Sequence, residues 1–153
     1  MYYFAYGCNM NHVEMLAKHC PGAQFIGPGK LEGYWFVFDG YSVEYKGAIE
    51  NIVRSKEDEV WGGVFEITEA HLEALDREKG YPRYYSRELM DVELPGTKEK
   101  VKAWAYSHEP LASGLPSRSY LKTLVQGAHD CHIPENYIDI NIDVHPLANC
   151  RFY

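Results

Sequence analysis

The sequence predicts a single α+β domain in which a meander of β-strands forms the core and helices flank it. Of its 153 residues, 46% are hydrophobic, which is enough for one sizeable core without a set of disulfides. Short runs of aromatic and β-branched residues, bounded by Gly and Pro, alternate with stretches of helical apolar spacing. Because no repeat, low-complexity tract or linker divides the chain, we expect residues 1–153 to form one domain.

Most of the predicted strands lie in the first part of the chain. Residues 2–6 are expected to form a strand that ends at Gly7, after which Asn11 can cap a helix that runs through Val13. A Gly- and Pro-rich turn at residues 27–29 is expected to separate two further strands. The strands expected after the first helix cover residues 25–26, 34–38, 48–53 and 60–67.

A helix and a hairpin are predicted next. Thr68 can cap a helix over residues 69–79, whose apolar residues recur at helical spacing, and Gly80 followed by Pro82 stops it. A β-hairpin is then expected to turn at Pro95-Gly96. Its strands should cover residues 84–94 and 101–106, with Leu89, Val92, Val101, Ala103 and Ala105 pointing inward.

The last part of the chain predicts a loop and two helices. Residues 108–116 are expected to form an exposed loop, and Ser117 can cap a helix from residue 118 to about residue 129. Pro134 suits the first turn of a shorter helix through Ile140. The tail over residues 143–153 packs either on this domain or on a second copy, so a homodimer remains open.

Composition excludes several classes of function. Fifteen Lys and Arg against 22 Asp and Glu leave a formal charge of −7, and no basic cluster interleaved with aromatics is present, so we expect no nucleic-acid partner. The chain has no basic leader and no run of about 18 apolar residues, which argues against secretion and against membrane insertion. Cys8, Cys20, Cys131 and Cys150 lack paired spacing, so free thiols in a reducing cytoplasm are expected.

The segment Tyr6-Gly7-Cys8-Asn9-Met10 carries the first chemical signal. A glycine at a strand-to-helix turn lets successive backbone N–H groups point at one spot, where they bind an anion or an oxyanion. Many such turns contain Gly for steric reasons alone, so this interpretation needs support from elsewhere in the chain. The Cys8 thiol is either a small buried residue of the turn or a nucleophile.

Residues 75–85, LDREKGYPRYY, carry the second signal. They place charged side chains at a helix C-terminus just before an aromatic turn, where such groups serve as acid or base; solvated helix ends look the same. Other patterns weigh less. His129, Cys131 and His132 lack a fourth metal ligand at a typical spacing, and no GxSxG elbow is present for a serine triad.

Several segments together resemble the γ-glutamylcyclotransferase (AIG2-like) family. Residues 3–10, YFAYGCNM, are similar to the family's YGSN signature, and residues 75–80, LDREKG, are similar to its LDxxEG motif. The resemblance spans residues 2–140 and implies a small mixed β-barrel with flanking helices, a fold that does not by itself fix activity. The other matching segments, in the same order as in the family, are residues 47–52, 59–62, 116–120, 127–128 and 133–137.

The resemblance implies a reaction that needs no cofactor and no metal. The α-amine of a γ-glutamyl amide attacks its own γ-carbonyl, which closes the lactam 5-oxoproline and releases an amine or an amino acid. One carboxyl group near both nitrogens can take the proton from the first and deliver it to the second. The small-molecule substrate would lie against Tyr6 and the backbone N–H groups of Gly7, Cys8, Asn9 and Met10.

Two tyrosines and two loops complete the site that the resemblance implies. Tyr85 and Tyr120 match tyrosines that line the substrate site, Tyr85 after one missing residue in the preceding turn and Tyr120 without adjustment. The pocket wall opposite the γ-glutamyl group is expected from loops such as residues 41–46 and 109–115. Those loops would select the leaving amine, whose identity the sequence does not reveal.

The sequence departs from the family pattern at the catalytic position. The family's glutamate directly precedes the glycine of LDxxEG, and here that residue is Lys79, with Glu78 one position earlier. One residue along a helix turns a side chain by about 100°. A change of register at the helix end would nevertheless bring Glu78 to the site as acid and base.

Two other interpretations stay open. Glu50, at a strand position where relatives commonly have a small residue, either forms an ion pair with Lys79 or faces a desolvated Lys79 of lowered pKa, and both arrangements restore proton transfer. Alternatively, catalysis is lost, which leaves a pocket for a γ-glutamyl or carboxylate ligand or a different acyl- or amine-transfer reaction. A carboxylate within about 4 Å of the amides of residues 7–10 would favour chemistry, whereas a pocket lined only by Lys79 and tyrosines would favour binding.

Overall fold

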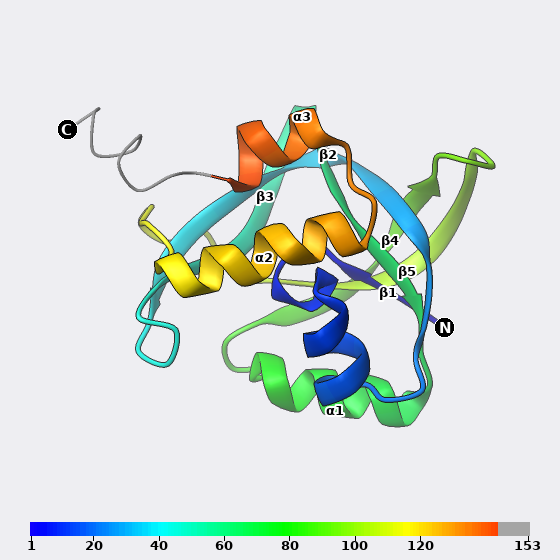
Figure 1. Ribbon diagram of the computed structural model, residues 1–153, viewed down its shortest axis with the longest axis horizontal. Coiled ribbons are helices and arrows are strands. Elements are labelled where there is room, and N and C mark those ends of the chain that lie inside the picture. The colour runs from blue at the N-terminus through cyan, green and yellow to red at the C-terminus, as the bar shows by residue number, and fades with distance from the viewer. Residues whose placement is uncertain (144–153) are drawn as a thin grey trace.

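In residues 1–143, which the computed structural model describes, five strands close into a barrel (Figure 1). They are hydrogen-bonded in the order β1-β3-β2-β4-β5, and β5 pairs back with β1. The β1–β5 pair is parallel and the other pairs are antiparallel, so the predicted mixed barrel is confirmed. The strands are β1 (Tyr2–Ala5), β2 (Gln24–Ser42), β3 (Gly47–Glu66), β4 (Ser86–Leu94) and β5 (Glu99–Ser107).

The long strands β2 and β3 differ from the prediction. Residues 27–29 form no turn, because the pairing with β3 shifts by one residue between Phe25 and Gly27 and then continues. A bulge of this kind accepts the Gly and Pro that a regular ladder would reject. The predicted turn is therefore wrong. The predicted gap between the strands at residues 48–53 and 60–67 is wrong as well, because the polar residues 54–59 belong to β3.

The β4–β5 hairpin is confirmed, but one of its predicted inward residues is wrong. Leu89 is 49% exposed, whereas Met90 and Val92 are buried. Successive side chains of a strand point to opposite faces, so Met90 and Val92 share the core face and Leu89 lies on the other. Ala103 and Ala105 are fully buried on β5, as predicted.

Helix α1 (Glu69–Lys79) begins and ends where the sequence predicts. The Thr68 hydroxyl accepts a hydrogen bond from the His71 N–H, and the His71 ring accepts one from the Thr68 N–H. This reciprocal pair satisfies two of the helix's N-terminal N–H groups. Gly80 follows with a φ of 66°, a left-handed conformation that glycine adopts without strain, and closes a regular Schellman motif.

The other helical segments also begin near their predicted caps. Asn11 accepts hydrogen bonds from the N–H groups of Val13 and Glu14, and Ser117 accepts one from the Tyr120 N–H. Figure 1 shows α2 lying across the barrel. The segments are the 3₁₀ turn η1 (Cys8–Met10), the π-helix η2 (Val13–His19), α2 (Arg118–Asp130), α3 (Glu135–Tyr137) and the π-helix η3 (Ile138–Ile142).

Packing between these segments assembles one end of the molecule. Turn η1 packs against α2, and η2 packs against α1, so the loop after β1 lies between two helices. In the described part of the chain, Cys8, Cys20 and Cys131 are buried and unpaired, while Cys150 and nearly all of the predicted tail lie outside it. None of the helices described is both long enough and apolar enough to cross a membrane.

Candidate active site

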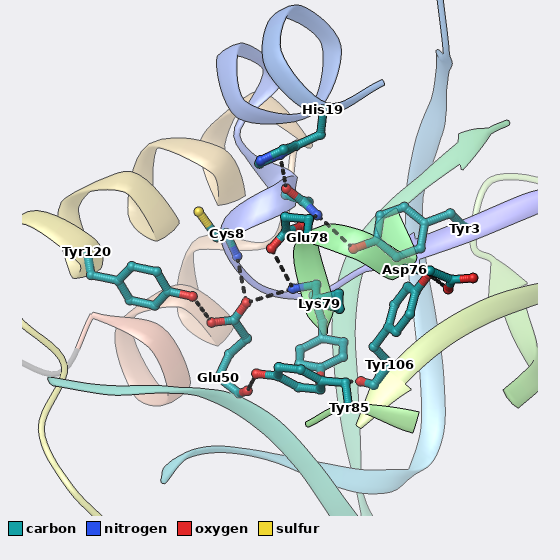
Figure 2. A network of polar contacts seen from close by, with 12 residues as sticks. Tyr3, Cys8, His19, Glu50, Asp76, Glu78, Lys79, Tyr85, Tyr106 and Tyr120 are labelled. Carbon is teal, nitrogen blue, oxygen red and sulfur yellow. Dashed lines mark hydrogen bonds and ion pairs between the residues drawn. The ribbon is translucent and has the colours of Figure 1, made fainter. Parts of the chain in front are cut away.

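A row of charges forms where the end of α1 meets β3 (Figure 2). The Lys79 Nζ lies 3.3 Å from Oε1 of Glu50 and 3.9 Å from Oε2 of Glu78. Glu50 comes from β3, whereas Glu78 and Lys79 end α1. All three residues line one pocket, and they are called its floor below. In space, the floor has the negative charge of Glu50, the positive charge of Lys79 and the negative charge of Glu78 in that order.

Asp76 fixes the end of α1 against the barrel. Its carboxylate accepts hydrogen bonds from Nε and Nη2 of Arg87, at 2.8 and 3.2 Å, and from the Tyr106 hydroxyl at 2.7 Å. Arg87 belongs to β4 and Tyr106 to β5. Because bidentate Arg–carboxylate pairs constrain geometry, the aspartate of the LDREKG segment positions Glu78 and Lys79, two and three residues later, at the pocket.

Both carboxylate oxygens and the backbone carbonyl of Glu50 accept hydrogen bonds. Its Oε1 accepts from the Cys8 N–H at 3.2 Å and from Lys79, and its Oε2 accepts from the Tyr120 hydroxyl. The Tyr85 hydroxyl donates to its backbone carbonyl at 2.6 Å. Burial alone would raise the pKa of Glu50, but the Lys79 charge and these donors outweigh burial and hold the pKa below its ordinary 4.5. Glu50 is therefore ionised at neutral pH.

Lys79 is charged as well. Burial alone would lower its pKa, but the carboxylates of Glu78 and Glu50 outweigh burial and hold the pKa well above the ordinary 10.5. The predicted ion pair with Glu50 is thus present, and the alternative of a Lys79 with lowered pKa is wrong. The ammonium also lies 5.2 Å from the centre of the Tyr85 ring, a favourable cation–π distance.

Glu78 reaches the floor of the pocket, as one interpretation expected. The change of register that was expected to bring it there is absent, because α1 ends in a regular Schellman motif. Its Oε1 accepts from Nδ2 of Asn9 at 2.9 Å. Asn9 is held in turn by the Tyr3 hydroxyl and by His19, each at 3.1 Å. The side chain of Glu78 is 19% exposed, against 2% for Glu50. Of the two carboxylates, Glu78 is the one that a ligand can reach.

The loop after β1 lies behind Glu50 rather than in the pocket wall. Residues 7–10 are all buried, and none of them lines the pocket. The Cys8 N–H is occupied by Glu50, and the Met10 N–H donates to the Gly7 carbonyl inside the 3₁₀ turn. Two of the four N–H groups that were expected to face a ligand are therefore already bonded within the protein. A Cβ at Gly7 would overlap the Glu50 side chain, which explains the glycine.

The remaining predicted residues divide into two groups. Tyr85 and Tyr120 line the pocket. Tyr6 does not, because its hydroxyl donates to the Tyr106 carbonyl inside the barrel. Burial, together with the charge of Glu50, raises the pKa of the Cys8 thiol far above its usual range, so this thiol is a poor nucleophile.

The pocket has a volume of about 870 Å³ and includes residues that sequence reasoning missed. Both predicted loops, residues 41–46 and 109–115, contribute to its lining. Asp39 and His108 also line it, with Oδ1 of Asp39 lying 3.3 Å from Nε2 of His108. No motif marks either residue, and the single available signal was an aspartate at the end of the apolar run FVFD.

Comparisons with known proteins agree with the resemblance in the sequence. The model of the AIG2-like family matches residues 59–140. γ-Glutamylcyclotransferases of Mus musculus and Homo sapiens are each 28% identical, over 142 and 141 residues, which cover 88% of this chain and 73% of each relative. The family match includes Glu78, Lys79, Tyr85 and Tyr120, whereas Glu50 precedes it.

Solved structures extend the similarity to the whole fold. A γ-glutamyl cyclotransferase superposes with a TM-score of 0.87 at 27% identity, over 95% of this chain and 88% of that one. An AIG2-like protein from Mus musculus superposes with a TM-score of 0.58 at 26% identity, over 78% of this chain and 81% of that one.

Proposed function

Because the chain belongs to the AIG2-like family, we propose that it is an enzyme of the γ-glutamylcyclotransferase type, which converts a γ-glutamyl amide into 5-oxoproline and a free amine. The observation that carries the proposal is the row Glu50, Lys79 and Glu78 on the pocket floor. A γ-glutamyl group ends in an ammonium and a carboxylate on one carbon. The row offers each of these charges a partner of opposite sign, which favours that head group over singly charged ones.

The two ends of the row take different parts of the head group. Lys79 is the cation for the substrate's α-carboxylate. The carboxylate of Glu50 accepts a hydrogen bond from the Lys79 ammonium and so keeps Lys79 in place. Glu78 is the more exposed carboxylate and is the partner for the α-ammonium. The rings of Tyr85 and Tyr120 flank the same floor and limit access of water to it.

Glu78 moves the proton in this proposal. It accepts a proton from the α-ammonium, after which the nitrogen attacks the γ-carbonyl carbon and the new N–C bond closes the lactam. Glu78 delivers this proton to the amide nitrogen as the C–N bond of the γ-amide breaks. It then takes the second excess proton from the ring nitrogen and passes it to the released amine, which leaves as an ammonium ion, so the carboxylate ends ionised as it began. Glu50 suits this task less, because it is 2% exposed and its lowered pKa makes it a weak base.

Formation of 5-oxoproline tests the proposal. Purified protein is incubated with a panel of γ-glutamyl amino acids and γ-glutamyl amines, and 5-oxoproline is expected from at least one of them. Glu78→Gln should lower kcat by about 10²–10⁴-fold, because that is the usual contribution of a general acid–base group. Glu50→Gln should mainly raise KM, because Lys79 loses its fixed position.

A glutamate on the same helix provides the control. Glu73→Gln changes an exposed residue of α1 that does not line the pocket, so kcat and KM should stay at wild-type values. Wild-type activity in both Glu78→Gln and Glu50→Gln would remove the proposed mechanism.

One observation favours a second candidate function, the binding of a γ-glutamyl or carboxylate ligand without turnover. Oε1 of Glu50, 3.2 Å from the Cys8 nitrogen, meets the distance expected for chemistry, but it also occupies the N–H group that the family resemblance assigns to the substrate. A site whose backbone donor is occupied by the protein's own carboxylate stabilises an oxyanion poorly. Calorimetric binding of γ-glutamyl-alanine with no 5-oxoproline formed over hours would support this function, and rapid turnover would exclude it.

A further inference from the structure

Apolar side chains gather at the mouth of the pocket. Tyr41, Val43, Tyr84 and Leu111 are 70%, 84%, 74% and 58% exposed, and all four line it. They come from the end of β2, the β2–β3 turn, the loop after α1 and the loop before α2. Single exposed apolar residues are ordinary, but a group around one opening marks a binding surface. These four residues are called the apolar rim below.

The backbone holds part of the apolar rim in place. The Gly40 N–H donates to the Ala112 carbonyl at 2.9 Å, and the Leu111 N–H donates to Oδ2 of Asp39 at 3.1 Å. The Leu111 side chain packs against Gly40, and a Cβ added at Gly40 would lie 3.0 Å from Cδ1 of Leu111. Because these bonds pin the loop before α2 to the end of β2, this part of the rim is formed before any ligand arrives, which lowers the entropy lost on binding.

Charges around the same mouth balance one another. Arg77 and Arg83 are exposed and line the pocket, and so are Glu44 and Glu109. Exposed charges are screened by water and salt, and these four residues add no net charge to the mouth. A charged leaving group therefore gains little there, whereas an apolar one gains by removing rim surface from water.

Aromatic and apolar side chains lie between the charged floor of the pocket and solvent. The floor holds the row of charges, and the wall above it is aromatic, with the ring of Tyr45 4.7 Å from that of Tyr120. The apolar rim follows. A substrate with its charged head on the floor must therefore direct the other side of its amide bond toward aromatic and apolar surface.

We propose that the leaving group of the substrate is apolar and preferably aromatic, an amine or amino acid whose side chain lies against the apolar rim. The inference rests on the proposed function, because it requires the γ-glutamyl head group on the pocket floor. Aromatic rings would gain most, since ring pairs contribute beyond the area that they bury.

Glutaryl amides test the inference independently of turnover. A glutaryl amide keeps the carboxylate and the amide of the substrate but has no α-amine, so it cannot cyclise. Calorimetry on the intact protein should give a Kd for glutaryl-phenethylamide that is lower than that for glutaryl-ethylamide by about 10-fold or more, because a buried ring adds that much. Equal Kd values for the two amides would overturn the inference.

Matched variants locate the effect. Tyr41→Ser combined with Tyr84→Ser should reduce the ratio of the two Kd values to below about 3-fold, because both aromatic rings of the rim are removed. Leu89→Ser changes an exposed leucine outside the pocket and should keep the wild-type ratio. An unchanged ratio in the double variant, with the melting temperature preserved, would overturn the assignment to the rim.

The outcomes separate this inference from the proposed activity. Tighter binding of the phenethylamide without any 5-oxoproline from the substrate panel removes the activity and leaves the rim as the part of the site that binds an apolar group of the ligand. Production of 5-oxoproline with equal Kd values for the two glutaryl amides supports the proposed activity and overturns the inference about the leaving group. A wild-type dimer that the double variant converts to monomer, on size-exclusion chromatography, would assign the rim to a second copy and also overturn the inference.

Discussion

The floor and the mouth of the pocket are built in opposite ways. On the floor, the side chains of Glu50 and Lys79 are only 2% and 9% exposed, and both oxygens of Glu50 have donors. At the mouth, Tyr41 and Val43 are 70% and 84% exposed. Buried charges depend on every partner, whereas exposed apolar groups contribute only the area that a ligand covers. Floor substitutions should therefore cost stability, and rim substitutions should change ligand preference alone.

The largest expected effect is that of Lys79→Met. The variant leaves Glu50 buried without its counter-ion, so the free energy of unfolding should fall by about 3–5 kcal/mol, the usual result of removing one partner of a buried pair. Urea denaturation followed by circular dichroism measures it. A loss below about 1 kcal/mol would mean that the floor behaves like the surface.

An exposed ion pair serves as control for that variant. The Lys102 Nζ lies 2.8 Å from Oδ1 of Asp91, closer than the pair on the floor, but the side chains are 67% and 57% exposed. Lys102→Met should change the free energy of unfolding by less than about 1 kcal/mol, because solvent and salt screen such pairs. The contrast isolates burial from distance.

A smaller effect is expected for Tyr120→Phe. The variant removes the hydroxyl that donates to Oε2 of Glu50, and a hydrogen bond to a charged group contributes about 1.5–3 kcal/mol. Tyr84→Phe, at the 74% exposed rim tyrosine, should stay within about 0.5 kcal/mol of wild type. Equal losses in the two variants would erase the distinction between floor and rim.

The smallest effect concerns pH and compares wild type with Glu50→Gln. Because the folded-state pKa of Glu50 lies below 4.5, its charge stabilises the fold fully above 4.5, and this contribution is lost as pH falls through the folded-state value. The stability that wild type has relative to the variant should therefore decrease as pH falls below 4.5. Urea titrations at several pH values check this, and a constant difference down to strongly acid pH would contradict it.

Local signals in the sequence were sufficient for α1 and for the caps of the other helices. Thr68 and Gly80 act within a few residues of themselves, through backbone groups that any helix end leaves open, so their effect is readable without tertiary contacts. The turn predicted at residues 27–29 failed for the opposite reason. Whether Gly and Pro end a strand or bulge it depends on the partner strand, here β3.

The candidate site was only partly predictable. The sequence drew attention to Glu50, Glu78 and Lys79, but it left open which of them interact and what charge Lys79 has. Those answers depend on burial and on distances between β3 and the end of α1. For the rim, the sequence predicted only that two loops would form a wall of the pocket. Which of their side chains surround the opening, and that Tyr84 joins them, depends on tertiary packing.

The sequence by itself determined the ends of α1, the β4–β5 hairpin and the segments that resemble the family, because these depend on neighbouring residues. Only the tertiary structure decided that Glu50 covers the Cys8 N–H, pairs with a charged Lys79 and leaves Glu78 as the reachable carboxylate. The physical reason is that charge and access at the site depend on how residues far apart in the chain bury one another, and no local pattern encodes that.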